Sequence, residues 1–380
     1  MKAVIAAGGT AGHINPALAI AGAIMDNEKG SEVVFFGRED GMEKKLVEQA
    51  GYRMIPLETH GFVRSFKPKD LLENANSVRC ALKAERICGE FFREFQPDVV
   101  IGCGGYNSGP VVEKAAKMGI PTAIQEQNSF PGVTTKLLSR RADRIFAANA
   151  EAVERIGYPE KSVVSGNPVR AEFYTANREL LRRRWGIGDR TCILSFGGSL
   201  GARTINELSA RLMQLNRDDP DIFHIHATGQ YAVESFPQML AAGGVDPKSP
   251  RIRVEEFITD MPQCYAAADL IISRAGAITV SEIIAAGRAS VLIPSPNVTE
   301  NHQYYNALTL KNIGAALLFE EKDIDIDAVA REVARLAADR QRLRMMGVNA
   351  RSLAVPNTAK LIYDNIARMV ADKKNGRKNV

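Results

Sequence analysis

A single histidine follows a glycine-rich turn near the start of the chain. Residues 4–7 predict a buried strand, Gly8-Gly9-Thr10 predicts a turn, and His13 falls in the first turn of the helix that follows. The partial positive charge at a helix start disfavours an imidazolium, so we expect a neutral ring there. A neutral imidazole can take a proton from an alcohol, which makes His13 a candidate general base; the alternative is a histidine that only caps the turn.

A second turn of the same kind lies near the middle of the chain. LSFGGSLGA, which holds Gly197 and Ser199, repeats the order of IAAGGTAGH: a strand, two glycines, a hydroxyl residue and a helix start. Backbone N–H groups in such turns, together with a helix N-terminus, can bind an anion. Neither turn is a GxGxxG or Walker A sequence, which argues against a dehydrogenase or a P-loop enzyme. Each turn alone could be structural, but two at equivalent places favour a diphosphate site.

Two further groups of polar residues follow predicted strands, where open parallel sheets bind ligands. Glu282 lies in a helix after the strand 270–273, and its carboxylate could accept hydrogen bonds from two ribose hydroxyls. An ordinary carboxylate in the first turns of a helix is the alternative. Asn301-His302-Gln303 follows the strand 291–294 and suits sugar hydroxyls, although a polar loop is the simpler interpretation.

The residues that could bind a metal have unsuitable spacings. The histidines are scattered, and His224 and His226 alternate along a predicted strand, which favours positions in the core or on the sheet face. Asp323, Asp325 and Asp327 match a DxD pattern formally, but they lie in a charged connector and are more typical of a helix start. We therefore predict no protein-bound metal and no cofactor.

Short β-branched runs alternate with helical patterns along the whole chain. This alternation predicts an α/β fold with parallel sheets that are covered by helices on both faces. The predicted strands are Val4–Ala7, Val33–Phe36, Val99–Ile101, Thr122–Gln125, Arg144–Ala147, Cys192–Phe196, Ile222–Ala227, Leu270–Ser273 and Val291–Pro294.

The chain also repeats itself at a larger scale. DVVIGCGGYNSG, which begins at Asp98, is matched by DLIISRAGAITVSE, which begins at Asp269. Two similar α/β halves explain this echo, although βαβ units always resemble one another. Gly, Asn and Pro at residues 165–168 indicate a connector. We expect domains at residues 1–165 and 166–355, with a final helix at 357–371 that packs back on the first domain.

Composition and charge exclude several other classes of protein. The chain has 380 residues, 45% apolar and 24% charged, as is usual for a globular protein, and its net charge of +5 is too small to imply a nucleic-acid partner. Five scattered cysteines without a CxxC pair suit a reducing compartment. The longest apolar run is far shorter than the ~18 residues of a spanning helix, and early glycines argue against a signal peptide.

The motifs taken in order resemble the MurG-type glycosyltransferases, the UDP-N-acetylglucosamine–N-acetylmuramyl-(pentapeptide) pyrophosphoryl-undecaprenol N-acetylglucosamine transferases. The resembling segments are AAGGTAGHINPALAIA, IGCGGYNSGP, EQNSFPG, SGNPVR, LSFGGSLGAR, EFITDMPQCYAAADLIISRAGAITVSEIIAAG and NHQYYNA. The resemblance implies a GT-B fold, in which two Rossmann-like domains face each other across a cleft. It also implies transfer of N-acetylglucosamine, with inversion, from UDP-N-acetylglucosamine to the C4 hydroxyl of lipid I, which gives lipid II.

The resemblance also implies roles for individual residues. It places uracil at the backbone of Phe257-Ile258, with Arg170 beside it, the diphosphate at Ser199 and the ribose at Glu282. Gln303 would read the sugar hydroxyls, and His13 would be the general base. The helix start expected to meet phosphate comprises Ala277, Ile278, Thr279, Val280 and Ser281, and the contacts to the donor sugar in the first half are Thr10, Ala11, Gly12 and Asn128. Ala11 departs from the family's GGTGGH, and a left-handed backbone there would put the loop geometry in doubt.

A lipid acceptor requires contact with a membrane, and two basic clusters in the first half could supply it. The first comprises Arg64, Lys67, Lys69, Arg79, Lys83, Arg86 and Arg93 among the apolar Phe62, Val63, Phe66, Leu71 and Leu72; the second comprises Lys136, Arg140, Arg141 and Arg144. Cations beside exposed apolar groups suit an anionic membrane surface, and a solvated helix face is the alternative. We expect a peripheral enzyme on the cytoplasmic face of the membrane, with cell-wall synthesis proteins as candidate partners.

Three other functions fit parts of the pattern. A diacylglycerol glycosyltransferase would share the GT-B fold and use a neutral lipid acceptor. A UDP-N-acetylglucosamine 2-epimerase would share the architecture without a lipid acceptor, and a nucleotide-sugar-binding protein would show no turnover. NHQYYNA and GGSLGAR together favour the lipid II reaction over all three.

Overall fold

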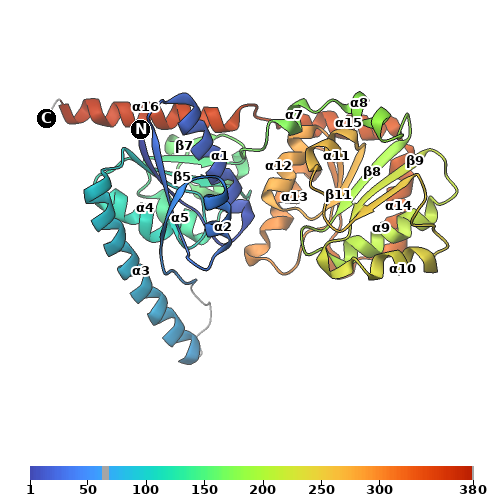
Figure 1. Ribbon diagram of the computed structural model, residues 1–380, viewed down its shortest axis with the longest axis horizontal. Coiled ribbons are helices and arrows are strands. Elements are labelled where there is room, and N and C mark those ends of the chain that lie inside the picture. Colours follow the sequence, from blue (N-terminus) through green and yellow to red (C-terminus); the bar gives the residue numbers. More distant parts are fainter. Residues whose placement is uncertain (62–67, 379–380) are drawn as a thin grey trace. The chain divides into compact units, whose positions relative to one another are not determined.

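The chain folds into two compact units, each a parallel sheet with helices on both faces (Figure 1). The computed structural model describes residues 1–61 and 68–378. The first unit comprises Met1–Pro168 together with the C-terminal segment from Asn357, and the second comprises Val169–Pro356. The division therefore falls at Pro168, inside the Gly-Asn-Pro connector of the sequence.

The sheet of the first unit has seven parallel strands in the order β3-β2-β1-β4-β5-β6-β7. Its central strands are continuous apolar runs, as expected for strands that are buried on both faces. The strands are β1 (Lys2–Ala6), β2 (Glu32–Gly37), β3 (Arg53–Pro56), β4 (Val99–Gly102), β5 (Thr122–Glu126), β6 (Arg144–Ala147) and β7 (Ser162–Val164).

Helices cover both faces of this sheet. One face packs against α1 (Ala11–Asn27), α2 (Met42–Gln49) and α16 (Thr358–Lys378), and the other against α3 (Pro68–Phe95), α4 (Ser108–Lys117), α5 (Val133–Ser139) and α6 (Ala150–Ile156). Ile362 and Ile366 of α16 are fully buried beside α1, so the end of the chain completes the core of the first unit. The first part of α3 extends beyond the sheet (Figure 1).

The second unit repeats the strand order of the first. Its six parallel strands run β10-β9-β8-β11-β12-β13, which is the 3-2-1-4-5-6 order of a Rossmann-type sheet. The strands are β8 (Thr191–Phe196), β9 (Ile222–Ala227), β10 (Ile252–Glu255), β11 (Leu270–Ser273), β12 (Ala289–Leu292) and β13 (Ala316–Leu318). This shared order agrees with the two similar halves that the sequence predicted.

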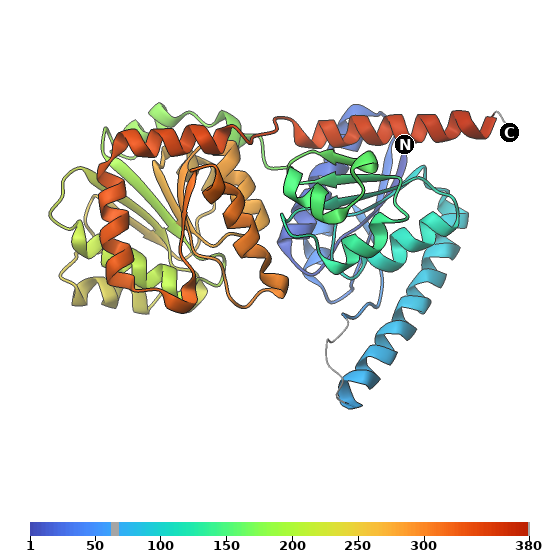
Figure 2. The same ribbon diagram turned by 180° about the vertical axis from the view of Figure 1, so that it is seen from behind.

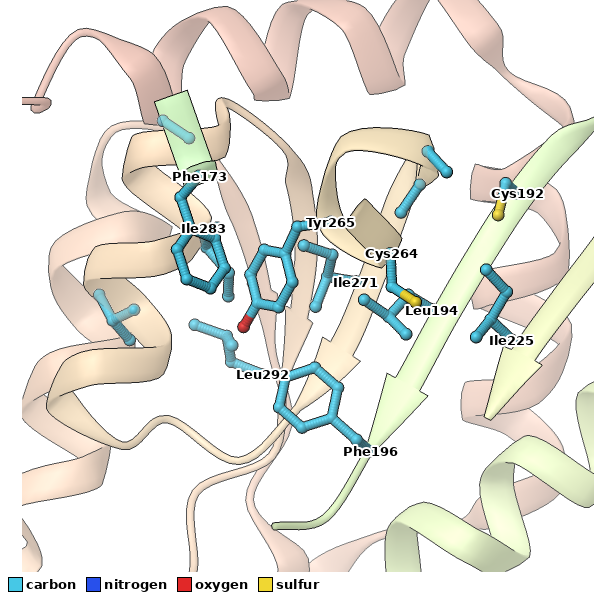
Figure 3. Close-up of a cluster of buried hydrophobic side chains, with 14 of the residues drawn as sticks. Phe173, Cys192, Leu194, Phe196, Ile225, Cys264, Tyr265, Ile271, Ile283 and Leu292 are labelled. Carbon is cyan, nitrogen blue, oxygen red and sulfur yellow. The ribbon is translucent and has the colours of Figure 1, made fainter. Parts of the chain in front are cut away.

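The helices of the second unit enclose two apolar layers. One layer contains α7 (Glu172–Thr175), α11 (Met261–Ala267), α12 (Ala277–Ala286) and α13 (His302–Asn312), and the other contains α9 (Arg203–Leu215) and α14 (Ile326–Ala338). The first layer centres on Tyr265, which lies between Phe173 and Phe196 (Figure 3). The remaining helices are α8 (Arg178–Arg184), α10 (Ser235–Ala242) and α15 (Arg340–Arg351).

The C-terminal part of the second unit differs from the pattern expected from the sequence. The helical pattern from 329 to 343 is two helices rather than one, because the Asp339 carboxylate accepts from the N–H of Arg342 at 2.9 Å and starts α15. Within the part of the chain that the structure describes, no helix combines the length and the apolar character that a membrane crossing would need.

Candidate functional site

Each sheet reverses its strand order between its two central strands, and the loops after those strands hold several of the candidate residues. In the first unit the reversal lies between β1 and β4, and in the second between β8 and β11. Ligands of open α/β sheets bind at this crevice, outside the carboxyl ends of the strands. The two glycine-rich turns follow β1 and β8, so both lie at such a position.

His13 is held by the turn that precedes it. Its Nδ1 atom lies 2.9 Å from the carbonyl oxygen of Gly8 and 3.4 Å from the Thr10 hydroxyl. A carbonyl oxygen can only accept, so in the neutral ring Nδ1 carries the hydrogen and Nε2 keeps its lone pair. The ring is half-buried and packs against Gly104, where an added Cβ would lie only 2.6 Å from Cδ2 of His13.

The backbone of the first turn explains its glycines. Gly9 has φ +87°, and a Cβ at Gly8 would lie 2.1 Å from the amide nitrogen of Asn107. Ala11 is the first residue of α1 and lies in its helical conformation, so the left-handed backbone that would have put this position in doubt is not adopted. The extra methyl group is therefore compatible with this turn.

A buried carboxylate supports the turn from behind. Glu43, which is 1% exposed, accepts hydrogen bonds from the backbone N–H of Arg38 at 2.9 Å and from the Asn107 amide at 3.0 Å, and its second oxygen lies 3.4 Å from the N–H of Gly9. The Asn107 amide also donates to the carbonyl of Ala7 at 3.2 Å. Glu43 and Asn107 thus fix the turn, although neither was a candidate site residue in the sequence.

Asn128 lies in the loop after β5, and a second buried carboxylate shapes that loop. Glu126 accepts from the backbone N–H of Asn128 at 2.9 Å, from its side-chain amide at 3.2 Å and from the N–H of Gly132 at 3.1 Å. The neighbouring Gln127 amide donates to the carbonyl of Cys103 at 3.0 Å. This bond ties the Asn128 loop to the segment that leads into Gly104 and thus to the surroundings of His13.

In the second unit, the turn after β8 leaves the Ser199 hydroxyl exposed. Gly198 and Gly201 have φ values of +95° and +86°, and a Cβ at Gly201 would lie 2.3 Å from the carbonyl oxygen of Thr228. The carbonyl of Ser199 accepts from the N–H of Gln230 at 3.2 Å. The turn is therefore anchored through its backbone, while its hydroxyl stays available to a ligand.

The helix α12 starts beside this turn, directly after β11 and Gly276. The first N–H groups of a helix have no partner within it, so Ala277, Ile278 and Thr279 present donors to an anion. The N–H of Val280 instead donates to the carbonyl of Gly276 at 2.9 Å, and its side chain is buried. The Ser281 hydroxyl donates to the carbonyl of Ala277 at 2.9 Å.

Glu282 follows on the same helix and meets a buried phenol. Tyr265 is fully buried, and its hydroxyl donates to the Glu282 carboxylate at 3.1 Å. Burial raises the pKa of the Glu282 carboxyl to about 7, against the opposing effects of the Tyr265 hydrogen bond and of the Arg170 charge. Arg170 in turn lies over the ring of Phe173 at 5.5 Å, which packs edge-on against Tyr265.

The segment before α13 has an unusual backbone. Glu300 and Asn301 have positive φ values of +56° and +51°, which non-glycine residues rarely adopt outside functional or turn positions. The side-chain oxygen of Gln303 accepts from the N–H of Ser295 at 2.9 Å, so the amide nitrogen is oriented to donate elsewhere. The Asn306 amide donates to the carbonyl of Ala275 at 3.2 Å and ties α13 to the start of α12.

Two neighbouring residues in the loop between β10 and α11 differ in exposure. Ile258 is 2% exposed and packs into the core, whereas Phe257 is 59% exposed. A ligand that approaches this loop therefore meets the side chain of Phe257 and not that of Ile258.

Comparison with known proteins shows which family the chain belongs to. Residues 3–147 match the glycosyltransferase family 28 N-terminal domain, and residues 192–362 match the family 28 C-terminal domain. A UDP-N-acetylglucosamine–N-acetylmuramyl-(pentapeptide) pyrophosphoryl-undecaprenol N-acetylglucosamine transferase from Acetivibrio thermocellus is 39% identical over 99% of this chain and 100% of its own. The chain belongs to the MurG family. The crystal structure of Acinetobacter baumannii MurG matches it with a TM-score of 0.78 and 31% identity, over 97% of this chain and 99% of that one.

Membership of the MurG family confirms the predicted GT-B fold of two Rossmann-like domains. A UDP-GlcNAc 2-epimerase from Neisseria meningitidis matches with a TM-score of 0.67 at 13% identity, over 97% of this chain and 100% of that one. An identity this low shows a shared fold alone. The two MurG relatives, at 39% and 31% identity, confirm the resemblance to the MurG family that the motifs indicated.

Other predictions for this MurG-family chain concern residues away from the turns. His224 and His226 are buried in β9, where burial lowers the pKa of each imidazole to about 3, so the expected core role is confirmed. Asp325 accepts from the N–H of Ala328 at 3.0 Å and starts α14, as the sequence predicted. Glu321, in contrast, bonds to Thr204 of α9 and to Arg274, so this charged connector contacts the helix after the second glycine turn.

Three potential metal ligands come together in the first unit without any signal in the sequence. One ligand atom each from Glu58, His60 and Cys80 lie within 4.8 Å of one another. Glu58 already pairs with Lys83 at 3.2 Å, and Cys80 is buried. No further residue of the described chain is grouped with them, so we assign this cluster no function.

Proposed function

We propose that this protein transfers N-acetylglucosamine from UDP-N-acetylglucosamine to the C4 hydroxyl of the N-acetylmuramoyl unit of lipid I, which yields lipid II for peptidoglycan synthesis. The observation that carries the proposal is the 39% identity, over almost the whole of both chains, to an enzyme named for this transfer. The glycine turns and polar side chains that we assign to the reaction lie at the carboxyl ends of the two sheets, which supports the proposal.

We assign proton transfer to His13. Its Nδ1–H is directed at the carbonyl of Gly8, which leaves Nε2 as the proton acceptor. The C4 oxygen of the acceptor attacks the anomeric carbon as its proton moves to Nε2, and the bond from the anomeric carbon to the diphosphate oxygen breaks. Attack on the side opposite the leaving group inverts the anomeric centre and gives a β linkage.

We assign the donor nucleotide to the second unit. The N–H groups that start α12, together with the Ser199 hydroxyl, would meet the diphosphate, and they would stabilise the negative charge on UDP as it leaves. Glu282 in its ionised form would accept hydrogen bonds from both ribose hydroxyls. The backbone of Ile258 would meet uracil beside Arg170, and Gln303 would donate to the hydroxyls of the sugar.

We assign Thr10, Ala11, Gly12 and Asn128 to contacts with the donor sugar. The Glu43 and Glu126 carboxylates support these residues by fixing the backbone of the two loops that carry them. Neither carboxylate is proposed to touch a substrate. A loss of either one would act through loop geometry.

We further propose that the enzyme works at the cytoplasmic face of the cell membrane as a peripheral protein. The helices α3 and α5 lie on the same face of the first sheet, and both expose apolar side chains: Leu82 is 64% and Leu137 is 71% exposed. Arg79 and Lys83 flank Leu82, and Lys136 and Arg140 flank Leu137. Arg144 begins β6 and is half-buried, so it is removed from the second cluster, while Arg64, Phe62, Val63, Phe66 and Lys67 lie outside the described residues.

The stereochemistry of the product tests the proposed displacement directly. Proton NMR of the disaccharide lipid formed from UDP-N-acetylglucosamine and a short-chain lipid I analogue should show a new β-1,4 linkage and one UDP released for each linkage. A product with an α linkage would contradict a single displacement assisted by His13. Hydrolysis or epimerisation of the donor without any disaccharide would contradict the proposed transfer.

A further inference from the structure

A large arginine-lined cavity lies in the second unit at the edge opposite to the candidate donor site. Its volume is about 1000 Å³, and it opens beside the first residues of β8 and β12, Thr191 and Ala289. The glycine turn and the start of α12 lie instead where β8 and β11 end. In both ribbon views α8 and α15, which form the walls of this cavity, run side by side along one edge of the unit (Figures 1 and 2). We call this cavity the arginine cavity.

Positive charge is in excess in the arginine cavity. Eight arginines and three acidic residues line it. At its inner wall the Asp269 carboxylate accepts hydrogen bonds from both Arg178 and Arg182 and from the N–H of Cys192 at 2.8 Å, so its capacity is largely used. Arg178 and Arg182 also donate to backbone carbonyls near the end of α11. The third inner arginine, Arg288, donates to the carbonyls of Tyr265 and Ala266 at 2.9 and 2.8 Å and pairs with no carboxylate of the described residues. One carboxylate thus faces three guanidinium groups.

The excess of positive charge in the cavity affects the pKa of Arg288. Burial lowers the pKa of its guanidinium to about 10, and the neighbouring charges of Arg178 and Arg182 act in the same direction against the opposing effect of Asp269. A bound anion would oppose this lowering of the pKa, because its negative charge would offset the repulsion and its oxygens would accept further hydrogen bonds from the guanidinium.

The rim of the cavity carries arginines that the fold does not use. Arg183, Arg340 and Arg344 are exposed, and none of them forms an ion pair with any acid in the part of the chain that the structure describes. Arg340 and Arg344 stand one turn apart on α15 and therefore share a face of that helix. Arg340 is the first residue of α15, where the helix dipole disfavours a cation, so local stability does not explain its position.

The floor of the cavity is fixed by a close helix contact. A Cβ on Gly347 of α15 would lie 2.6 Å from the carbonyl oxygen of Gly287, which ends α12 with φ +63°. The two glycines let α15 approach the end of α12, and this approach brings the rim arginines near the inner ones. The backbone contact between α12 and α15 therefore sets the position of the rim arginines, in addition to the conformations of their side chains.

We propose that the arginine cavity binds an anion with two or more linked phosphate groups, at a site separate from the donor site. Guanidinium groups match phosphate oxygens with paired hydrogen bonds, and several of them at one site favour linked phosphates over a single one. A cavity of this size accommodates a ligand as large as a nucleotide. The phosphates could belong to a soluble diphosphate or to an anionic lipid headgroup, and the experiment separates these sources.

The test measures pyrophosphate binding to the full chain by isothermal titration calorimetry, with UDP present at saturation so that the donor site is occupied. The variant is Arg340→Glu with Arg344→Glu. The matched control is Arg331→Glu with Arg335→Glu, an exposed pair with the same spacing on α14 and outside the cavity. A parallel arm measures co-sedimentation with vesicles that contain cardiolipin, an anionic lipid whose headgroup links two phosphates.

We expect one pyrophosphate per chain, with an affinity that falls about tenfold or more in the cavity variant because charge-assisted hydrogen bonds to two arginines are lost. The control variant should keep the affinity of the unmodified chain. Vesicle binding that depends on Arg340 and Arg344, without pyrophosphate binding, would assign the phosphates to a lipid headgroup and support the same site. The proposal is overturned if neither probe binds, if UDP abolishes pyrophosphate binding, or if the cavity and control variants behave alike. Because the probes do not report transfer, failure here leaves the proposed reaction untouched.

Discussion

The Nδ1 atom of His13 lies 2.9 Å from the carbonyl oxygen of Gly8, the first glycine of the turn that starts the chain's first helix. This contact selects one tautomer of the neutral ring, because the carbonyl can only accept a hydrogen bond. The free lone pair then belongs to Nε2. The turn that we propose to contact the donor sugar thus also orients the proposed base, through the carbonyl of Gly8.

Replacement of His13 tests its proposed role. His13→Ala should lower kcat by about 10²–10⁴-fold, the usual contribution of a general base. The affinity for UDP should change little, since the proposed nucleotide contacts lie in the second unit. Steady-state kinetics with a lipid I analogue, together with calorimetry of UDP, measure both quantities. A variant that retains near-normal kcat would remove His13 from the mechanism.

The contact between His13 and Gly104 provides a second, independent test. Gly104→Ala should lower kcat because its Cβ would displace the imidazole ring, which lies 2.6 Å from the position of that atom. The substitution also adds backbone strain of about 1–2 kcal/mol, because Gly104 has φ +88°. Gly157→Ala is the matched control, with φ +82° and nothing within 4 Å of the added Cβ. Similar kcat values for the two variants, each checked for folding by thermal melting, would contradict a steric link to His13.

The raised pKa of Glu282 predicts that UDP binding depends on pH. Below the pKa of about 7 the carboxyl is protonated and loses acceptor capacity, so the affinity for UDP should rise as the pH increases from 6 to 8. Glu282→Gln removes this titration and serves to separate it from the titration of UDP itself. Tyr265→Phe removes the hydrogen bond that lowers this pKa, so its pH profile should move to higher pH. Identical profiles for the unmodified and Glu282→Gln proteins would exclude a ribose contact through the carboxylate.

The same carboxyl group links pH to stability, with a definite sign. Its pKa in the folded unit lies above its ordinary value of 4.5, so the folded state binds the proton more tightly than the unfolded state between pH 4.5 and about 7. Its contribution to the free energy of unfolding should therefore decrease as the pH rises through this window. In thermal melting, Glu282→Gln should gain stability relative to the unmodified protein on going from pH 5 to pH 8. An equal difference at both values would show that the carboxyl is not buried as described.

Charge reversal on α3 tests the membrane-facing surface. Arg79→Glu with Lys83→Glu should weaken co-sedimentation with anionic vesicles about tenfold or more, because each cation near such a surface contributes about 1 kcal/mol. Arg331→Glu with Arg335→Glu changes the net charge equally on the second unit and should have little effect. Equal losses in both variants would indicate a response to net charge alone, and no loss in either would remove α3 from the membrane contact.

The central strands could be predicted from the sequence, whereas the strands at the edges could not. Strands buried on both faces, such as β1 and β8, appear as continuous apolar runs. The edge strands β3 (RMIP) and β10 (IRVE) were missed, since they are short, half-buried and contain arginine. The predicted strand Val291–Pro294 was displaced along the chain, because apolar residues continue past the end of β12 at Leu292.

In the candidate site, likewise, some features could be predicted from the sequence and others could not. The glycine turns leave a trace in the sequence, because a positive φ at Gly9 or Gly198 excludes most other residues. The supporting contacts leave none: Glu43 reaches Asn107 across 64 positions of the chain, and Tyr265 meets Glu282 from a different helix. A buried carboxylate or phenol is identified only when the fold shows what surrounds it.

The acceptor that receives the sugar tests the central claim most directly. The full chain is incubated with UDP-N-acetylglucosamine labelled in the sugar, in parallel with a lipid I analogue and with diacylglycerol in the same detergent, and the label in each lipid is counted. We predict label in the lipid I product, and a large loss of that label in His13→Ala, with none in diacylglycerol. Label in diacylglycerol alone would contradict the assignment and identify a glycolipid synthase, and label in neither lipid despite tight UDP binding would favour a nucleotide-sugar-binding protein.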